Sequence, residues 1–285
     1  MRVLRESAPA KINLTLDVLS KREDGYHDLE TIMQSVSLTD EITVEIGTGA
    51  PWAISCDRDE IPCDRRNLAW KAAEIFCEAL SWDPNGLRIT IQKRIPSEAG
   101  LGGGSSDAAA VLRLLNRCVP EPLSEIELAT LGAKVGSDVP FCVLGGTAFC
   151  EGRGERLTPM ETEHKLNYVL CKPDLAFSTP KLFAKIDSAQ ILSRPDHHAM
   201  KGALKAGDPC SVGRLLCNVF EAAVTEEYGD IPLIKELLIR YGACGAQMTG
   251  SGSVVFGVFS TEEGALKATQ TLKSDYPNTY FCKTV

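Results

Sequence analysis

A glycine-rich segment that runs directly into a helix-forming segment is the feature that most constrains this chain. Residues 95–112 read Ile-Pro-Ser-Glu-Ala-Gly-Leu-Gly-Gly-Gly-Ser-Ser-Asp-Ala-Ala-Ala-Val-Leu. The four glycines within residues 100–104 permit positive φ angles and let backbone N–H groups approach an anion closely. We expect Ser105, Ser106 and Asp107 to provide N-cap side chains for the following helix. A helix that begins here directs free N–H groups and its positive dipole end toward a bound polyphosphate.

Two other interpretations of this loop are open to test from the sequence. It is not a Walker A loop, because no Gly-Lys-Ser/Thr follows the first glycine at the required spacing. The dinucleotide-binding pattern also lacks support, since no acidic residue that would close a βαβ unit is recognisable about 20 residues further on. A plain connecting turn is the remaining alternative, and phosphate binding is favoured over it.

The composition is that of an ordinary globular protein, with 285 residues, 44% hydrophobic and 24% charged residues, and a net charge of −8. The acidic balance argues against nucleic acid as a partner, because counterion release needs a basic surface. No apolar run is long enough for a membrane span, and the N-terminus lacks a signal-peptide pattern, so we expect a cytoplasmic protein without membrane partners. Eleven scattered cysteines without a C-x-x-C pair indicate reduced, mostly buried thiols rather than a zinc site.

Hydrophobic periodicity predicts a mixed order of strands and helices without regular βαβ repeats, which indicates two α+β domains. A charged, turn-rich stretch at residues 151–163 is the expected boundary, giving domains 1–155 and 156–285. We expect residues 194–201 to form a polar loop. The expected strands are 8–19, 41–46, 52–56, 86–93, 141–150, 166–171, 243–248, 254–259 and 280–283, and the expected helices are 67–80, 108–118, 124–134, 179–186, 209–217, 221–228, 232–240 and 262–274.

Three further positions carry alternatives that the sequence leaves open. Asp138 precedes Val-Pro and is either a helix N-cap or a carboxylate placed in a cleft, and the two roles are compatible. Tyr26 and His27 end a charged loop and read, from composition alone, as ordinary loop anchors. A second glycine cluster at residues 245–253 is a tight turn between strands or, together with the first loop, part of one polyphosphate site.

Three elements in this order and spacing resemble the signature motifs of the GHMP kinases, the family of galactokinase, homoserine kinase and mevalonate kinase. They are residues 9–13 (Pro-Ala-Lys-Ile-Asn), residues 96–106, and residues 245–253. The resemblance covers nearly the whole chain. It implies an α+β, two-domain fold, with an N-terminal domain like domain 2 of ribosomal protein S5 and a ferredoxin-like C-terminal domain. It also implies ATP-dependent phosphorylation of an alcohol, with Mg²⁺ bridging phosphate oxygens.

Other segments resemble the branch of this family whose acceptor is a polyol linked to cytidine diphosphate. These are Asp-Gly-Tyr-His at 24–27, Gly-Ser-Asp-Val-Pro-Phe at 136–141, and Ser-Thr-Pro at 178–180 with Phe183. By this resemblance Asp138 is the base that deprotonates the acceptor 2-hydroxyl. Lys11 is its partner, which keeps the carboxylate ionised and offsets charge on the transferring phosphoryl group.

The resemblance also assigns the binding residues, without naming any protein ligand of the metal. Glu98 departs from the family pattern, in which a small residue is common, and this leaves the details of phosphate contact open. The residues assigned to ATP are Pro96, Ala99, Gly100, Leu101, Gly102, Gly103, Gly104, Ser105, Ser106, Asn67, Leu68 and Lys93. Those assigned to the acceptor are Asn13, Tyr26, His27, Thr179, Phe183, Gly250 and Ser251. Among the acceptor residues, the resemblance implies that Tyr26 and Phe183 stack on cytosine and that His27 hydrogen-bonds its edge.

The expected partners are therefore small molecules, namely ATP and the cytidine-diphosphate-linked polyol, in a monomer or weak homodimer. Two alternatives remain: another GHMP kinase, such as a mevalonate-type enzyme, or an inactive GHMP-fold sensor of a metabolite. The presence of both Lys11 and Asp138 argues against the sensor.

Overall fold

The computed structural model describes residues 1–162, 164–175, 177, 179–224 and 229–285. The chain forms two compact units that are interleaved in sequence. Unit 1 contains Met1–Ala10, Thr39–Ser97 and Gly102–Gly145, and unit 2 contains Lys11–Leu38, Glu98–Leu101 and Gly146–Val285. The interleaving arises because strands β1 (Arg2–Lys21) and β2 (His27–Ile46) each contribute residues to both units. The division at residue 155 stays a prediction about sequence domains.

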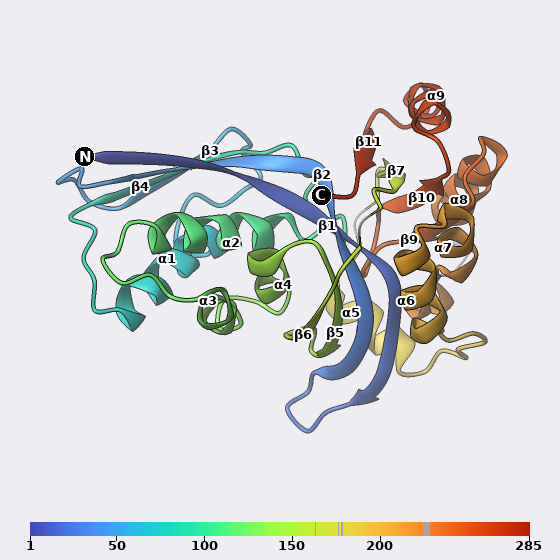
Figure 1. Cartoon of the computed structure of the whole chain (residues 1–285), viewed down its shortest axis with the longest axis horizontal. Coiled ribbons are helices and arrows are strands. Elements are labelled where there is room, and N and C mark those ends of the chain that lie inside the picture. Colours follow the sequence, from blue (N-terminus) through green and yellow to red (C-terminus); the bar gives the residue numbers. More distant parts are fainter. Residues whose placement is uncertain (163, 176, 178, 225–228) are drawn as a thin grey trace. The chain divides into compact units, whose positions relative to one another are not determined.

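Unit 1 places helices against a sheet. Strand β3 (Ala53–Cys56) is parallel to β4 (Leu87–Gln92), which is antiparallel to Glu41–Ile46 of β2. Helices α1 (Leu68–Ala79) and α2 (Gly103–Asn116) run along this part of the sheet (Figure 1). Helix α2 also packs against α3 (Glu125–Gly132) and α4 (Val139–Leu144). Its apolar residues from position 108 to 115 are buried on every side, so α2 is the central helix of unit 1.

Two predicted helix starts in unit 1 are confirmed. The Asn67 side chain accepts the Ala69 N–H at 2.9 Å and caps α1. Ser124 and Glu127 form both bonds of the capping box that opens α3.

The predicted start of α2 is wrong. The helix begins at Gly103, five residues before the expected start, and its N-cap is Gly102 in the left-handed conformation, with no side-chain cap bond. Ser105, Ser106 and Asp107 lie inside the helix. The Ser106 hydroxyl donates to the Pro9 carbonyl, and Asp107 accepts from a lysine, so neither side chain caps the helix.

Two further element predictions are also wrong. The strand predicted at 141–150 begins only at Thr147, as β5 (Thr147–Gly152). Residues 139–144 form helix α4, and two glycines at positive φ separate this helix from the strand. The expected polar loop at 194–201 overlaps α6 (His197–Ala206), which Asp196 caps by accepting the Ala199 N–H.

Unit 2 contains the first part of β2, which pairs with β5, and β5 in turn pairs with β6 (Arg156–Met160). Strand β1 is parallel to the short β8 (Cys217–Asn218). A second, four-stranded antiparallel sheet has the order β11-β7-β10-β9. Its strands are β7 (Asn167–Cys171), β9 (Gly245–Met248), β10 (Val255–Phe259) and β11 (Thr279–Lys283).

Helices pack on this second sheet and bury its apolar side chains. They are α7 (Pro209–Leu215), α8 (Asp230–Arg240) and α9 (Glu262–Leu272). The short α5 (Thr179–Ile186) packs on the 3₁₀ helix η1 (Val219–Ala223). Part of the predicted helix at 221–228 lies outside the described residues.

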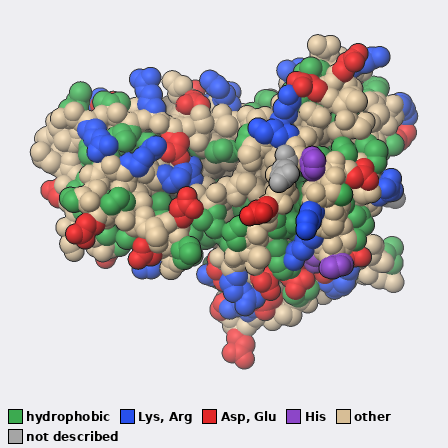
Figure 2. Space-filling view, in the orientation of Figure 1, with side chains coloured by type: hydrophobic (Ala, Val, Ile, Leu, Met, Phe, Trp, Pro, Cys, Tyr) green, Lys and Arg blue, Asp and Glu red, His purple; other side chains and the backbone are tan. Residues whose placement is uncertain are grey.

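The surface charges, the helices and the cysteines can be compared with what the composition predicted. Figure 2 shows acidic and basic side chains interspersed over the visible face. Among the described residues, none of the helices combines the length and apolarity needed to cross a membrane. All eleven cysteines are free thiols, but only four of them are buried, so the expectation of mostly buried thiols is wrong.

Candidate active site

In unit 2 all three sequence motifs meet at one place. The Asn13 N–H donates to Thr249 Oγ1 at 2.9 Å, which joins the first motif to the third. The Thr249 hydroxyl lies 3.5 Å from the Gly100 carbonyl oxygen, and the Val254 N–H donates to the Ala99 carbonyl at 3.2 Å. Segments that are far apart in the sequence therefore contact one another through residues of all three motifs.

Glycine is required where the second and third motifs touch. Gly100 has a φ of +74°, and a Cβ at this position would lie 2.2 Å from the Thr249 carbonyl oxygen. Gly250 has a φ of +55°, and a Cβ there would lie 3.1 Å from the Gly100 carbonyl oxygen. The two backbones thus pack against each other without intervening side chains.

Lys11 is buried in unit 2 and bonded through both its backbone and its side chain. Its N–H donates to the Leu101 carbonyl at 2.9 Å, and its Nζ donates to Asn13 Oδ1 at 2.9 Å. The Asn13 amide donates to Thr31 Oγ1 at 2.9 Å, which fixes which end of the amide faces the lysine. Lys11 is therefore a buried ammonium held in place by its neighbours.

In unit 1 the predicted base lies beside the start of α2. Asp138 is half-buried and occupies the N-cap position of α4, but its side chain accepts no capping bond. The side-chain cap is therefore wrong, and the role of a carboxylate placed in a cleft stays a prediction. The same turn is close to α2, since a Cβ on Gly136 would lie 3.9 Å from Ser105 Oγ.

The glycine loop is open to a ligand over only part of its length. Residues 102–105 are half-buried or exposed at the N-terminus of α2, whereas Ser106 is fully buried, with its N–H and hydroxyl both donating inside unit 1. Pro96 is half-buried. The exposed N-terminal turn, at residues 102–105, is the part of unit 1 suited to bind phosphate. Glu98 is exposed, with a φ of +50°.

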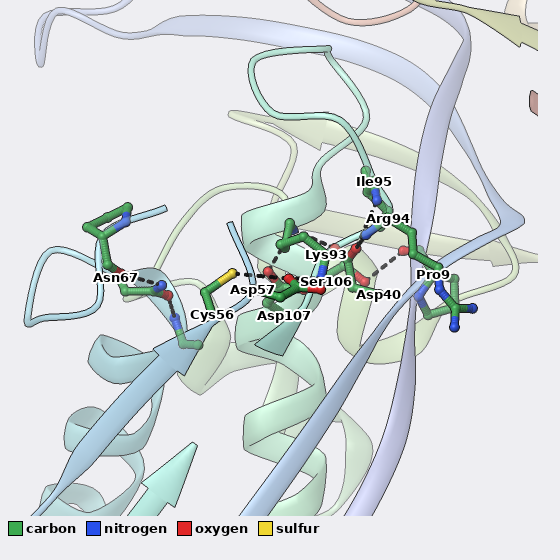
Figure 3. Close-up of polar contacts among 12 residues, drawn as sticks. Pro9, Asp40, Cys56, Asp57, Asn67, Lys93, Arg94, Ile95, Ser106 and Asp107 are labelled. Carbon is green, nitrogen blue, oxygen red and sulfur yellow. Dashed lines mark hydrogen bonds and ion pairs between the residues drawn. The ribbon is translucent and has the colours of Figure 1, made fainter. Parts of the chain in front are cut away.

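The two residues predicted to line the adenine pocket lie beside this turn. A Cβ on Gly104 would lie 3.6 Å from Leu68 Cδ1. The Asn67 side chain is engaged at both ends, because it caps α1 and donates to the Pro62 carbonyl at 2.8 Å (Figure 3). The backbone of Asn67 is also bonded, because its N–H donates to the Asp64 carbonyl and its carbonyl accepts the Lys71 N–H, each at 3.0 Å. Its contact with adenine stays a prediction.

Lys93 has partners that sequence reasoning missed. Its Nζ donates to Asp40 Oδ2 at 2.5 Å and to Asp107 Oδ2 at 2.8 Å, and the residue is 7% exposed (Figure 3). Burial opposes the charge, but the carboxylates of Asp107 and Asp40 outweigh it and raise the pKa of Lys93. The ammonium is thus bonded to two carboxylates. Its contact with the nucleotide stays a prediction.

On the acceptor side, helix α5 and the third motif meet in unit 2. Thr179 Oγ1 and Ser251 Oγ lie 2.8 Å apart in a hydrogen bond. One turn further along α5, the ring of Phe183 stacks on the ring of His27, with centroids 4.8 Å apart and planes inclined by 21°. Tyr26 is 54% exposed, and the Arg153 guanidinium lies 5.0 Å from its ring centroid. In this structure the ring against Phe183 is therefore His27, while Tyr26 faces solvent.

Asp187 is a further residue at this place that sequence reasoning missed. Its Oδ1 lies 2.7 Å from His27 Nε2, and this hydrogen bond, together with Lys21, holds the pKa of the Asp187 carboxyl below its usual range. An ionised carboxylate only accepts, so Nε2 carries the proton. The four-residue spacing of Thr179, Phe183 and Asp187 could have shown that they share one face of α5.

The fold and these motifs define a kinase of one family. The sequence model described as "GHMP kinases N terminal domain" matches residues 67–146, and that described as "GHMP kinases C terminal" matches residues 200–278. The chain belongs to the GHMP kinase family, and the predicted two-domain α+β fold of that family is confirmed.

Individual members of the family are similar to this chain over nearly its whole length. The 4-diphosphocytidyl-2-C-methyl-D-erythritol kinase of Caldicellulosiruptor saccharolyticus is 44% identical over 93% of this chain and 91% of its own. The enzyme of the same name from Clostridium tetani is 42% identical over 99% and 100% of the two chains. A crystal structure of 4-(cytidine 5'-diphospho)-2C-methyl-D-erythritol kinase superposes with a TM-score of 0.83, at 32% identity over 98% of both chains. A homoserine kinase from Cytophaga hutchinsonii, with a TM-score of 0.77 and 17% identity over 99% of this chain and 94% of its own, shares the fold.

Proposed function

We propose that this chain transfers the γ-phosphoryl group of ATP to the 2-hydroxyl of 4-diphosphocytidyl-2-C-methyl-D-erythritol, giving the 2-phosphate and ADP. This is a step of the non-mevalonate pathway to isoprenoid precursors. The observation that carries the assignment is the identity of 42–44% to curated kinases of this name over nearly the full chain. The eleven free thiols suit the reducing cytoplasm that we propose for the enzyme.

In this reaction Asp138 is the general base. Its carboxylate accepts the proton of the 2-hydroxyl as that oxygen bonds to the γ-phosphorus. The bond from the γ-phosphorus to the bridging oxygen breaks, and its electron pair leaves with ADP. The ammonium of Lys11 favours the ionised base and offsets negative charge on the transferring group.

The exposed turn at residues 102–105 binds the phosphates of ATP through backbone N–H groups and the N-terminus of α2. Leu68 and Asn67 line the adenine pocket beside it. Mg²⁺ bound with the nucleotide would offset negative charge on the phosphates. The described residues contain no group of three or more His, Cys, Asp or Glu side chains suited to hold a metal ion.

The cytidine end of the acceptor binds where His27 and Phe183 stack. With Nε2 bonded to Asp187, Nδ1 is the ring nitrogen of His27 left to bond the base edge. Tyr26 is exposed and provides a second aromatic face for the base. Hydroxyl and amide groups near the third motif orient the polyol diphosphate, namely Asn13, Thr179, Gly250 and Ser251.

A coupled assay of ADP release tests the assignment. The purified chain is supplied with MgATP and, in separate reactions, the cytidylated acceptor, mevalonate or homoserine. We expect turnover with the cytidylated acceptor alone. Turnover of mevalonate without turnover of the cytidylated acceptor would contradict the proposal, and nucleotide binding without ADP release from any acceptor would favour an inactive sensor. Light scattering on the eluting protein would test for the monomer or weak homodimer that we propose.

A further inference from the structure

A buried ionic cluster connects the two ends of the glycine loop in unit 1 (Figure 3). Lys93, at the end of β4, bonds Asp40 of β2 and Asp107 of α2 through its ammonium. The other oxygen of Asp40 accepts the backbone N–H groups of Arg94 at 2.6 Å and Ile95 at 2.8 Å. The cluster therefore fixes the backbone that enters the loop and links it to the helix that leaves the loop.

The ammonium of Lys93 also lies close to the phosphate-binding turn. A Cβ on Gly103, the first residue of α2, would lie 3.1 Å from Lys93 Nζ. The lysine charge thus lies at the positive end of the helix dipole, where the carboxylates of Asp40 and Asp107 offset it. Movement of this ammonium would change both the electrostatic field and the packing beneath the exposed turn.

Packing alone does not account for the cluster. Moving charged groups out of water is costly, and apolar side chains of similar volume often give equal or greater stability than a buried ion pair. Here three ionisable side chains are at most 7% exposed. One oxygen of Asp107, Oδ1, is buried without a hydrogen-bond partner among the described residues. The arrangement carries a stability cost that a purely structural contact does not require.

Asp107 serves the cluster through one oxygen. Oδ2 accepts from Lys93, and burial raises the pKa of the Asp107 carboxyl to about 7, against the attraction of Lys93. At neutral pH a large fraction of this carboxyl is therefore protonated. A neutral side chain with an acceptor oxygen at the same position should reproduce its contact with the lysine.

We propose that Asp107 is a positioning residue for ATP, which acts through Lys93 to keep the start of α2 in the geometry that binds the nucleotide phosphates. The inference rests on the proposed kinase function and adds a residue that touches neither substrate. Displacement of a binding turn by about 1 Å is enough to cost up to about 10² in rate, so a residue that fixes the turn has a measurable effect.

Two substitutions that keep the branched side chain of four heavy atoms separate the acceptor oxygen from side-chain shape. Asp107→Asn keeps an oxygen for Lys93, and Asp107→Leu removes it. Binding of MgAMPPNP to the full chain is measured by titration calorimetry at pH 7. We expect Asp107→Asn to retain the affinity within about threefold, and Asp107→Leu to lose about tenfold, equal to about 1.4 kcal/mol. In steady-state assays the KM for ATP should rise with Asp107→Leu while the KM for the acceptor stays within about twofold.

Glu6→Gln is the matched control, because Glu6 pairs with Arg113 and Arg117 at the other end of α2. It should lower the melting temperature without changing MgAMPPNP affinity. Equal affinities for Asp107→Leu and the wild type would overturn the proposal, as would equal losses for Asp107→Leu and Glu6→Gln. If Asp107→Leu does not fold, an affinity loss above tenfold in Asp107→Asn overturns it instead. A wild-type chain that binds MgAMPPNP but does not phosphorylate the cytidylated acceptor contradicts the acceptor assignment alone, and the affinity comparison still decides the role of Asp107.

Discussion

His27 donates a hydrogen bond from Nε2 to Oδ1 of Asp187 over 2.7 Å, while its ring stacks on Phe183. The two contacts fix both the orientation of the imidazole and the nitrogen that carries its proton. His27 begins β2 and Asp187 directly follows α5, so the fold brings the proposed base-recognition group and its bonding partner together from distant parts of the chain.

Asp187→Ala should therefore weaken binding of the cytidylated acceptor and leave ATP unaffected. We expect the KM for the acceptor to rise about fivefold, because a partly exposed, charge-assisted hydrogen bond contributes about 1 kcal/mol. Steady-state kinetics with each substrate varied in turn measures the effect. Lys21→Ala is the control, since it removes only the longer, 3.3 Å contact to Asp187 and should change neither KM by more than about twofold. Equal increases in both KM values for Asp187→Ala would exclude this positioning role.

Asp138→Asn should abolish most of the turnover and leave the chain folded. The amide has nearly the same shape but cannot accept the proton of the 2-hydroxyl, and loss of a general base costs about 10²–10⁴ in rate. The measurement is kcat at saturating substrates, with the melting temperature as a check of folding. Glu127→Gln, which alters the capping box of α3, should lower stability while kcat stays near the wild-type value. A decrease of less than about tenfold in Asp138→Asn would show that another group is the base.

The sequence predicted most helices and strands, because each depends on a local pattern of apolar and polar residues. It also predicted that residues 9–13, 96–106 and 245–253 are the family motifs, and three of their residues, Asn13, Gly100 and Thr249, meet in unit 2. The start of α2 could not be predicted in the same way. Its N-cap is a left-handed glycine, and the polar residues of its first turns bond partners far away in the sequence.

The sequence also did not reveal the residues that bond to the predicted site residues, because these partners lie far away along the chain. Asp40 lies 53 positions from Lys93, and Asp187 lies 160 positions from His27, so no local spacing reveals either pair. Asp107 directly follows the second motif, and we expected its side chain to cap the helix. The roles that we propose for binding and catalytic residues come from family motifs, whereas the residues that support them depend on how the strands and helices pack.

Gly100→Ala should test the contact between the second and third motifs. The substituted residue would have a positive φ, and its Cβ would lie 2.2 Å from the Thr249 carbonyl oxygen. We expect a loss of about 1–2 kcal/mol from the backbone conformation and a further loss of about 1–3 kcal/mol from the overlap. Urea denaturation measures the free energy of unfolding.

Gly146→Ala is the control for Gly100→Ala, because the two glycines have similar φ angles but only a Cβ at Gly100 would overlap a neighbouring atom. Gly146 has a φ of +69°, with nothing within 4 Å of a Cβ at that position. It should lose only the backbone contribution, about 1–2 kcal/mol. If the two substitutions destabilise the chain equally, the close approach of Gly100 to Thr249 does not exist in solution.

Asp107→Asn should change how stability depends on pH. Burial raises the pKa of the Asp107 carboxyl from 3.8 to about 7, with Lys93 opposing the rise and Asp40 adding to it. The stability contributed by this group is fully present below its unfolded-state pKa and is lost as pH rises through about 7. Asn does not titrate, so the variant should gain stability relative to the wild type as pH rises from about 5 to 8.

Urea denaturation at intervals across this range gives the difference in free energy of unfolding. Asp64→Asn is the control, because the pKa of exposed Asp64 is about 2, so its difference from the wild type should stay constant over the same range. A constant difference for Asp107→Asn as well would mean that Asp107 is ionised throughout, and its burial would then have to be balanced entirely by Lys93.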